Sequence, residues 1–342
     1  MLYVSFHDNE QGKRNVAAYG DTGGLIIATV LTGPLPPAEA ELRGLTFAPS
    51  GPESMWVLNG ASKNSEIVSF ARLGVPWPYK FSGQVMAYDP DPAARSPLWH
   101  PFDLSFAEQD GTLYCYVSNQ DTNVVARLEL DTETMSWQLA PVAPALPPSD
   151  LEYLRGTFVA SSCGELPNVV KTPPVPESKG GLGVVIEGTG KNRKVTHSVR
   201  GVLWVNGALY VADEAGGEIK VYGADGSFYE PGTKLEAPVH LLVHEHEAGV
   251  QTLYVSAKKG VYWSPLRADA PGELELKLCI PMSDASGTAF GEDGSFYVAN
   301  RKLNQISRYE HFSPSSSQAP LASSTFEVLP EPEFIMYGLD GP

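Results

Sequence analysis

An internal repeat is the feature that most constrains how this 342-residue chain can fold. Each copy reads as an apolar strand, a turn with glycine, a second strand with an aromatic residue, one or two polar residues, and a third strand. The pattern recurs in five segments, residues 43–70, 102–131, 200–226, 239–266 and 286–310. A unit that returns at intervals of roughly 40 to 60 residues is typical of a β-propeller, whose four-stranded blades bury their apolar faces against neighbouring blades.

The two ends of the chain complete the pattern. The C-terminal EFIMYGLDGP reads as a first strand without a second, and the N-terminal MLYVSFHDNEQGKRNVAAYG reads as a second and third strand without a first. Joining them would leave no open sheet edge. We therefore predict an all-β fold in which residues 1–342 form a single β-propeller domain. Its ring is closed by N- and C-terminal strands that share one blade.

The number of blades stays open between seven and six. Six units are readable, and residues 147–198 have room for a seventh, with LRGTFVASS and GLGVVIEGTG as candidate strands. Seven four-stranded blades of about 49 residues (342/7) fit the length. Six blades with a long insertion are the alternative.

Composition excludes several classes of partner. A net charge of -16 argues against a nucleic acid, which needs clustered Lys and Arg. No segment approaches the roughly 18 apolar residues that span a bilayer. The three cysteines form no CxxC motif, and the N-terminus lacks the features of a secretory signal, so we predict a cytoplasmic protein without disulfides. The sequence leaves the oligomeric state undetermined.

Two segments carry a resemblance to known families. LYCYVSNQDTNVVARLELD resembles the repeat of YVTN-type propellers, and GALYVADEAGGEIKVYGADG resembles NHL-type and SMP-30/gluconolactonase-like propellers. The resemblance implies the propeller fold. In SMP-30-like enzymes, it also implies a divalent metal in the channel that polarises a lactone carbonyl or activates water. The early EGP-type motif that supplies one metal ligand in that family is absent from this chain.

Propeller sites lie at one end of the central channel, near the start of each innermost strand and the end of each second strand. At the strand starts we expect catalytic roles for His100, Asp103 and His240, because imidazole and carboxylate groups move protons. The basic residues of the LRG and VRG motifs, together with an N-terminal histidine, are the predicted substrate-binding residues: Arg43, Arg155, Arg200 and His7. Guanidinium groups bind carboxylate or phosphate through two parallel hydrogen bonds.

The second strands end on hard oxygen donors. These are Asn59, Asn119, Asp213 and Asn300. If they converge, they predict a site for one divalent cation, Ca²⁺ or Mg²⁺, the only cofactor that we expect. Asn and Asp at such positions also cap loops by accepting backbone N–H bonds, which is the structural alternative.

These residues favour an enzyme that acts on a small anionic organic molecule, with hydrolysis of a lactone or ester, assisted by a bound divalent cation, as the leading reaction. A metal-free lyase or cyclase that uses a histidine with Asp103 is the second hypothesis. The third is a non-catalytic interaction propeller, which would present a flat, aromatic-rich face to a protein partner.

Overall fold

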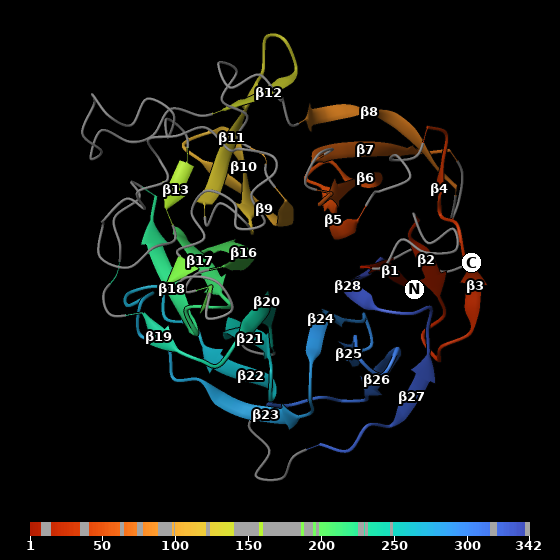
Figure 1. Ribbon diagram of the computed structural model, residues 1–342, viewed down its shortest axis with the longest axis vertical. Helices are drawn as coiled ribbons and strands as arrows, with labels where there is room; N and C mark the ends of the chain where they lie inside the picture. The colour runs from red at the N-terminus through yellow and green to blue at the C-terminus, as the bar shows by residue number, and fades with distance from the viewer. Residues whose placement is uncertain are drawn as a thin grey trace. The chain divides into compact units, whose positions relative to one another are not determined.

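The computed structural model is built from strands joined by turns (Figure 1). It describes residues 1–7, 15–34, 41–61, 65–73, 78–87, 98, 100–120, 124–139, 157–159, 186–187, 194–195, 198–224, 229, 232–246, 249–314 and 320–338. The described ranges contain no helix, which confirms the predicted all-β class.

Six sheets of four or five strands make up most of the described chain. The sheet with both chain ends, in the order β28-β1-β2-β3, contains β1 (Leu2–Phe6), β2 (Ala17–Tyr19), β3 (Leu25–Ile27) and β28 (Pro332–Tyr337). The next, in the order β4-β8-β7-β6-β5, contains β4 (Leu31–Thr32), β5 (Leu42–Ala48), β6 (Gly51–Asn59), β7 (Glu66–Arg72) and β8 (Tyr79–Ala87). A third contains β9 (Pro101–Gln109), β10 (Thr112–Asn119), β11 (Val124–Asp131) and β12 (Ser136–Leu139), with β13 (Thr157–Val159) beside β11.

The other three large sheets are simple four-stranded meanders. One contains β16 (Val199–Val205), β17 (Ala208–Asp213), β18 (Glu218–Gly223) and β19 (Thr233–Lys234). The next contains β20 (Pro238–Glu245), β21 (Gln251–Ala257), β22 (Gly260–Pro265) and β23 (Lys277–Pro281). The last contains β24 (Ala285–Phe290), β25 (Phe296–Asn300), β26 (Gln305–Tyr309) and β27 (Ser324–Glu327), while β14 (Ile186–Glu187) and β15 (Lys194–Val195) form a separate pair.

The predicted blade shared by the two chain ends is confirmed. β28 pairs antiparallel with β1, with Tyr3 opposite Met336 and Val4 opposite Ile335 (Figure 1). The six large sheets are the blades of a β-propeller, so the described residues support the six-blade alternative and seven blades are not confirmed. Within the segment expected to form a seventh blade, β13 joins the sheet of β11, and only β14 and β15 pair with each other.

Local sequence explains the hairpins. Asp110 and Gly111, between β9 and β10, both have positive φ (50° and 76°), as do Asn206 and Gly207 between β16 and β17 (51° and 75°). Asp-Gly and Asn-Gly are the pairs that best tolerate two left-handed residues in a two-residue hairpin turn. The second strands of these hairpins are β10 and β17. Most of β10 is buried, and β17 is buried throughout.

Aromatic pairs join successive blades at equivalent positions. A tyrosine of one blade's second strand packs on an aromatic residue near the end of the next blade's first strand. The pairs are Tyr3–Phe47, Tyr116–Trp204, Tyr254–Phe290 and Tyr297–Tyr337. These second-strand tyrosines therefore belong to the core between blades.

The glycines of the repeat let neighbouring first strands approach closely. A Cβ at Gly201 in β16 would lie 2.8 Å from the Val239 carbonyl oxygen, and a Cβ at Gly287 in β24 would lie 2.6 Å from the Ile335 nitrogen. Both distances are shorter than a side chain tolerates. The glycine of the VRG motif, and its counterpart after Ser286, is therefore explained by packing between blades.

The chain divides into two compact units. Unit 1 is Met1–Gln84, Leu242–Pro265 and Glu275–Pro342, and unit 2 is Val85–Leu241 and Leu266–Leu274. Every side-chain contact described below lies within one unit. The single domain over residues 1–342 stays a prediction.

Candidate functional site

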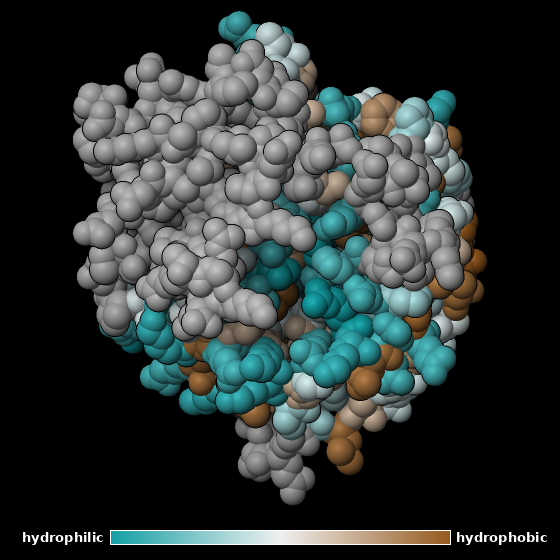
Figure 2. All heavy atoms as spheres, viewed as in Figure 1, coloured by the Kyte–Doolittle hydropathy of each residue, from teal (hydrophilic) through white to brown (hydrophobic). Residues whose placement is uncertain are grey.

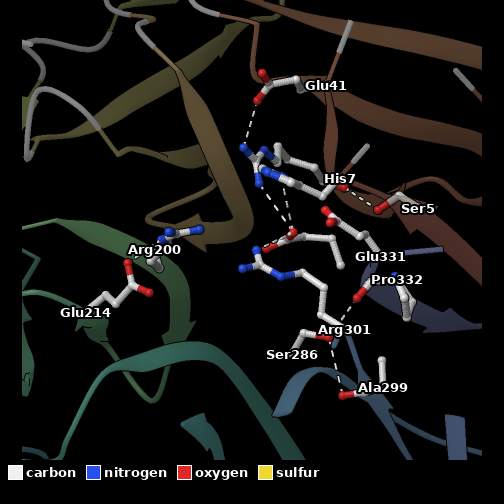
Figure 3. Close-up of polar contacts among 12 residues, drawn as sticks. Ser5, His7, Glu41, Arg200, Glu214, Ser286, Ala299, Arg301, Glu331 and Pro332 are labelled. Carbon is white, nitrogen blue, oxygen red and sulfur yellow. Dashed lines mark hydrogen bonds and ion pairs between the residues drawn. The ribbon is translucent and has the colours of Figure 1, made fainter. Parts of the chain in front are cut away.

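A buried carboxylate organises the main polar site of unit 1. Glu333, in β28, is 2% exposed. One of its oxygens, Oε2, lies 3.3 Å from Arg43 Nη1, 3.2 Å from Arg301 Nη1 and 3.5 Å from His7 Nδ1 (Figure 3). Arg43 also contacts Glu41, with 2.8 Å between Nη2 and Oε2. We call these five residues the Glu333 cluster: Glu333, Arg43, Arg301, His7 and Glu41.

Four sheet positions bring the cluster together. Arg43 is the second residue of β5 and Glu333 the second residue of β28, so they are equivalent in the repeat. His7 directly follows β1, and Arg301 directly follows β25. Ser5 fixes the first strand of the neighbouring sheet, because its hydroxyl donates to the Arg43 carbonyl oxygen at 2.7 Å.

The cluster has a buried half and an exposed half. The side chains of Arg43 and Glu333 are 2% and 1% exposed, whereas those of His7 and Arg301 are 33% and 41% exposed. A ligand in solution would therefore meet the imidazole and the Arg301 guanidinium, with the Arg43–Glu333 pair beneath them. The His7 Nδ1 atom is buried and makes no hydrogen bond, with Glu333 Oε2 3.5 Å away, so Nε2 is the ring nitrogen left to face a ligand.

His7 is held in its neutral form. The pKa of the His7 imidazole is lowered to about 4, mainly by burial and then by the positive charges of Arg43 and Arg301, against the opposing effect of Glu333 and Glu41. An unprotonated imidazole can accept a proton at neutral pH. An anion bound at Arg301 would offset the guanidinium charge and raise the basicity of His7.

The structure joins two predicted substrate-binding residues, His7 and Arg43, around a carboxylate that the sequence analysis missed. Arg301 and Glu41 were missed as well. The signal for Glu333 was present, because EFIMYG was identified as a first strand and its Glu stands at the register position of Arg43. Arg301 could have been found in the same way, since it follows Asn300 as His7 follows β1.

The predicted residues of unit 2 are engaged in a different way. Arg200 Nε donates to Glu214 Oε2 at 2.9 Å, and its guanidinium lies over the Phe102 ring at 4.6 Å from the centroid. Asp103 is buried, and its carboxylate accepts backbone N–H bonds from Leu104 at 2.8 Å and Val202 at 3.1 Å. Desolvation raises the pKa of the Asp103 carboxyl to about 7. These contacts fix Asp103 to the first strand of the next sheet.

The two predicted catalytic histidines differ in their surroundings. His240 is 8% exposed, and burial lowers the pKa of its imidazole to about 4. His100 is half-buried with a φ of 52°, and its carbonyl oxygen accepts a bond from the Gln120 N–H. Arg155 lies outside the described residues. The catalytic roles of His100, Asp103 and His240 stay predictions.

The predicted metal ligands make hydrogen bonds that hold turns. Asn59 Oδ1 accepts from the Glu41 and Ala61 N–H groups, and Asn300 Oδ1 accepts from Leu303 N. Asn119 donates to the Val117 carbonyl oxygen.

Asp213 is held still more firmly, by the Ser198 and Gly216 N–H groups and by Lys220 Nζ at 2.8 Å. Since the oxygens of Asn59, Asn300 and Asp213 already accept hydrogen bonds, these three residues fit a divalent cation poorly. Within the described ranges, no group of three or more His, Cys, Asp or Glu is arranged to hold a metal ion.

One face of the molecule is drawn with all atoms in Figure 2. Where described residues form that face, hydrophobic residues are scattered among hydrophilic ones and do not gather in one patch. The large exposed hydrophobics of the described chain likewise come from separate strands and turns, such as Leu73, Val250 and Leu321. This surface differs from the flat aromatic face that the interaction-propeller hypothesis expects.

Comparisons with known proteins find similarity in structure alone. No family model and no curated protein matches the sequence. A periplasmic gluconolactonase from Pseudomonas aeruginosa aligns over 99% of both chains at 14% identity with a TM-score of 0.52. At this low identity, the similarity to the gluconolactonase is limited to the fold.

Two other solved structures also resemble this chain in fold. A crystal structure of a nidogen/laminin complex matches 100% of this chain and 98% of its own at 11% identity, with a TM-score of 0.54. A putative 6-phosphogluconolactonase from Bacteroides fragilis matches 98% of this chain and 96% of its own at 13% identity, with a TM-score of 0.51. The predicted resemblance to gluconolactonase-like propellers is thus confirmed for the fold. None of the described segments is a helix that could cross a membrane.

Proposed function

We propose that this protein is a hydrolase that opens a lactone or ester of a small organic acid at the Glu333 cluster. The observation that carries the proposal is the contact of His7 Nδ1 with the buried Glu333 carboxylate, 3.5 Å away, beside the partly exposed Arg301. A carboxylate behind one imidazole nitrogen orients the ring and stabilises the imidazolium that forms when the other nitrogen takes a proton.

The reaction follows from these positions. His7 Nε2 accepts a proton from a water molecule as the water oxygen bonds to the substrate carbonyl carbon. The tetrahedral intermediate collapses by breaking the bond from that carbon to the ring or ester oxygen, and His7 returns the proton to this oxygen. The products are a hydroxyl group and a carboxylic acid, which ionises at neutral pH.

Arg301 supplies the positive charge for this reaction. Its guanidinium binds the carboxylate or phosphate of an anionic substrate, or the oxygen that gains negative charge in the intermediate. Arg43 is a positioning residue, because its buried guanidinium contacts both Glu333 and Glu41. The protein should therefore bind a small anionic substrate more tightly than a neutral one.

Two of the structural neighbours are described as a gluconolactonase and a putative 6-phosphogluconolactonase. These descriptions guide the choice of test substrates, which are glucono-δ-lactone, its 6-phosphate and p-nitrophenyl acetate. We expect hydrolysis above the spontaneous rate, with a lower KM for the phosphorylated lactone because Arg301 meets its charge.

The deciding experiment compares Arg301→Gln with Arg267→Gln. Arg267 is an exposed arginine paired with Asp269 and Glu273 outside the cluster, so its replacement is a matched control. Arg301→Gln should raise KM for the phosphorylated lactone at least tenfold and leave that of the neutral ester nearly unchanged. Equal KM values for the two variants, or no hydrolysis of any of the three substrates, would refute the proposal. Adding EDTA to the same assay tests the predicted divalent cation separately.

A further inference from the structure

A second arrangement of chemically active side chains lies in unit 1, outside the Glu333 cluster. His244 is the next-to-last residue of β20, and His246 directly follows the strand. Side chains two apart along a strand point to the same face. The two imidazole rings accordingly lie 4.8 Å apart between centroids, with an angle of 83° between their planes.

We propose that His244 and His246 form a chelating site for a borderline divalent transition metal ion, Cu²⁺, Ni²⁺ or Zn²⁺. This site is independent of the proposed hydrolase activity.

The spacing of the rings fits one shared ion. With metal–nitrogen distances of about 2.0–2.1 Å, each ring centroid lies about 3.2 Å from the ion. Two such ligands at an angle of roughly 90–109° then have centroids about 4.5–5.2 Å apart. The observed 4.8 Å falls inside this interval, so the two rings are close enough to bind the same ion once a nitrogen of each is turned toward it.

Neighbouring aromatic residues hold both rings in place. His246 Nε2 lies 2.5 Å from the Tyr254 hydroxyl, which occupies that nitrogen and leaves Nδ1 for a metal. Burial raises the pKa of Tyr254, so its hydroxyl stays a neutral partner. His244 stacks on Phe290 with 3.8 Å between centroids and 11° between planes. A hydrogen bond on the second nitrogen of a ligating imidazole fixes its tautomer and orientation, as in natural metal sites.

The protonation state also suits a metal ligand. Burial lowers the pKa of both imidazoles, and for His244 the charge of His246 lowers it further against the opposing effect of Glu245. Neutral imidazole is the form that coordinates a metal. In the described part of the chain no third His, Cys, Asp or Glu completes a cluster, so water takes the remaining positions. A two-ligand site of this kind selects metals in the order Cu²⁺ above Ni²⁺ and Zn²⁺, and it excludes Ca²⁺ and Mg²⁺, which prefer oxygen.

The test is isothermal titration calorimetry of the untagged, full-length protein at pH 7.5 with Cu²⁺, Zn²⁺ and Mg²⁺ in separate runs. We expect one Cu²⁺ per chain, with Zn²⁺ at least fivefold weaker and no heat from Mg²⁺. The variants are His244→Phe, which can keep the stack on Phe290, and His246→Gln. The control is His311→Asn, which removes an exposed histidine at a position with a φ of 48° that Asn tolerates.

Each of the two site variants should weaken Cu²⁺ binding at least tenfold, and the control should weaken it less than twofold. Circular dichroism must show unchanged folding, and electron paramagnetic resonance of the Cu²⁺ protein should show two nitrogen ligands that fall to one in His244→Phe. No Cu²⁺ binding at millimolar concentration, or equal binding by wild type and His244→Phe, would overturn the proposal. So would a loss as large in His311→Asn as in the site variants.

Discussion

Arg43 and Glu333 form a buried ion pair, 3.3 Å from Nη1 to Oε2, between residues 290 positions apart in the sequence (333 − 43). Their side chains are 2% and 1% exposed, so the pair lies beneath the solvent-facing His7 and Arg301. The pair links β5 to β28, and thus connects two blades as well as supporting the candidate site. Its removal should therefore affect stability and activity together.

Glu333→Gln should lower the free energy of unfolding by about 3–5 kcal/mol, because it removes the buried carboxylate that faces Arg43 and leaves the guanidinium paired with the partly exposed Glu41. Urea denaturation measures this loss. The control is Glu273→Gln, which removes an exposed partner of Arg267 and should change stability by less than about 1 kcal/mol. Similar values for the two variants would show that the Arg43–Glu333 pair is not a buried support.

Gly287→Ala tests the close approach of β24 and β28. The added Cβ would lie 2.6 Å from the Ile335 nitrogen, so a strand must shift, and we expect a loss of about 1–3 kcal/mol in thermal or urea denaturation. Gly24→Ala is the matched control, because no heavy atom lies within 4 Å of its added Cβ and its φ is not positive. If both variants are equally stable, the glycine has no packing role.

Stability should fall in mild acid because of His240. Its pKa is about 4 in the folded protein and 6.5 in the unfolded chain, so the unfolded chain binds more protons between these values. The free energy of unfolding then decreases as pH falls from about 6.5 to 4, by about 3 kcal/mol for the full shift. Urea denaturation at pH 7 and pH 4.5 should show this decrease, and His240→Gln should reduce it. If the free energy of unfolding falls equally with pH in His240→Gln and in the wild type, the decrease comes from groups other than His240.

The pH dependence of hydrolysis should report His7. Since its folded pKa is about 4, the imidazole stays unprotonated down to mildly acidic pH, and kcat/KM for the neutral ester should fall only near pH 4. Arg301→Gln removes a positive charge that lowers this pKa, so the acid limb should move to higher pH. A limb near pH 6.5 in the wild type, or one that does not move in the variant, would contradict the role of His7.

Much of this fold could be predicted because each copy of the repeat is recognisable from residues close together in the sequence. Short-range patterns indicate the Asp110-Gly111 and Asn206-Gly207 turns and the buried second strands. The two chain ends each lack the strand that the other supplies, which indicates that they pair. The blade count was harder. Residues 147–198 carry apolar runs that resemble strands, but a run such as TFV can add to an existing sheet, as β13 does beside β11, instead of starting a new one.

The candidate site was predicted only in part. His7 and Arg43 were found because polar residues at strand ends stand out in the sequence. The repeat register marks the positions of Glu333 and Arg301, but their contacts with Arg43 and His7 depend on packing between distant strands, which periodicity does not encode. Asn59 and Asn300 were predicted as metal ligands, but their oxygens accept backbone N–H bonds. An asparagine can bind a cation or hold a turn, and only the groups that face its oxygen decide which.

The most direct test of the central claim is steady-state kinetics of His7→Gln with glucono-δ-lactone and its 6-phosphate. The proposed mechanism predicts that kcat falls about 10²–10⁴-fold, the usual contribution of a positioned acid–base group, while KM and thermal stability change little. His311→Asn should keep full activity. A His7→Gln variant that is folded and as active as the wild type would contradict the assignment of catalysis to the Glu333 cluster.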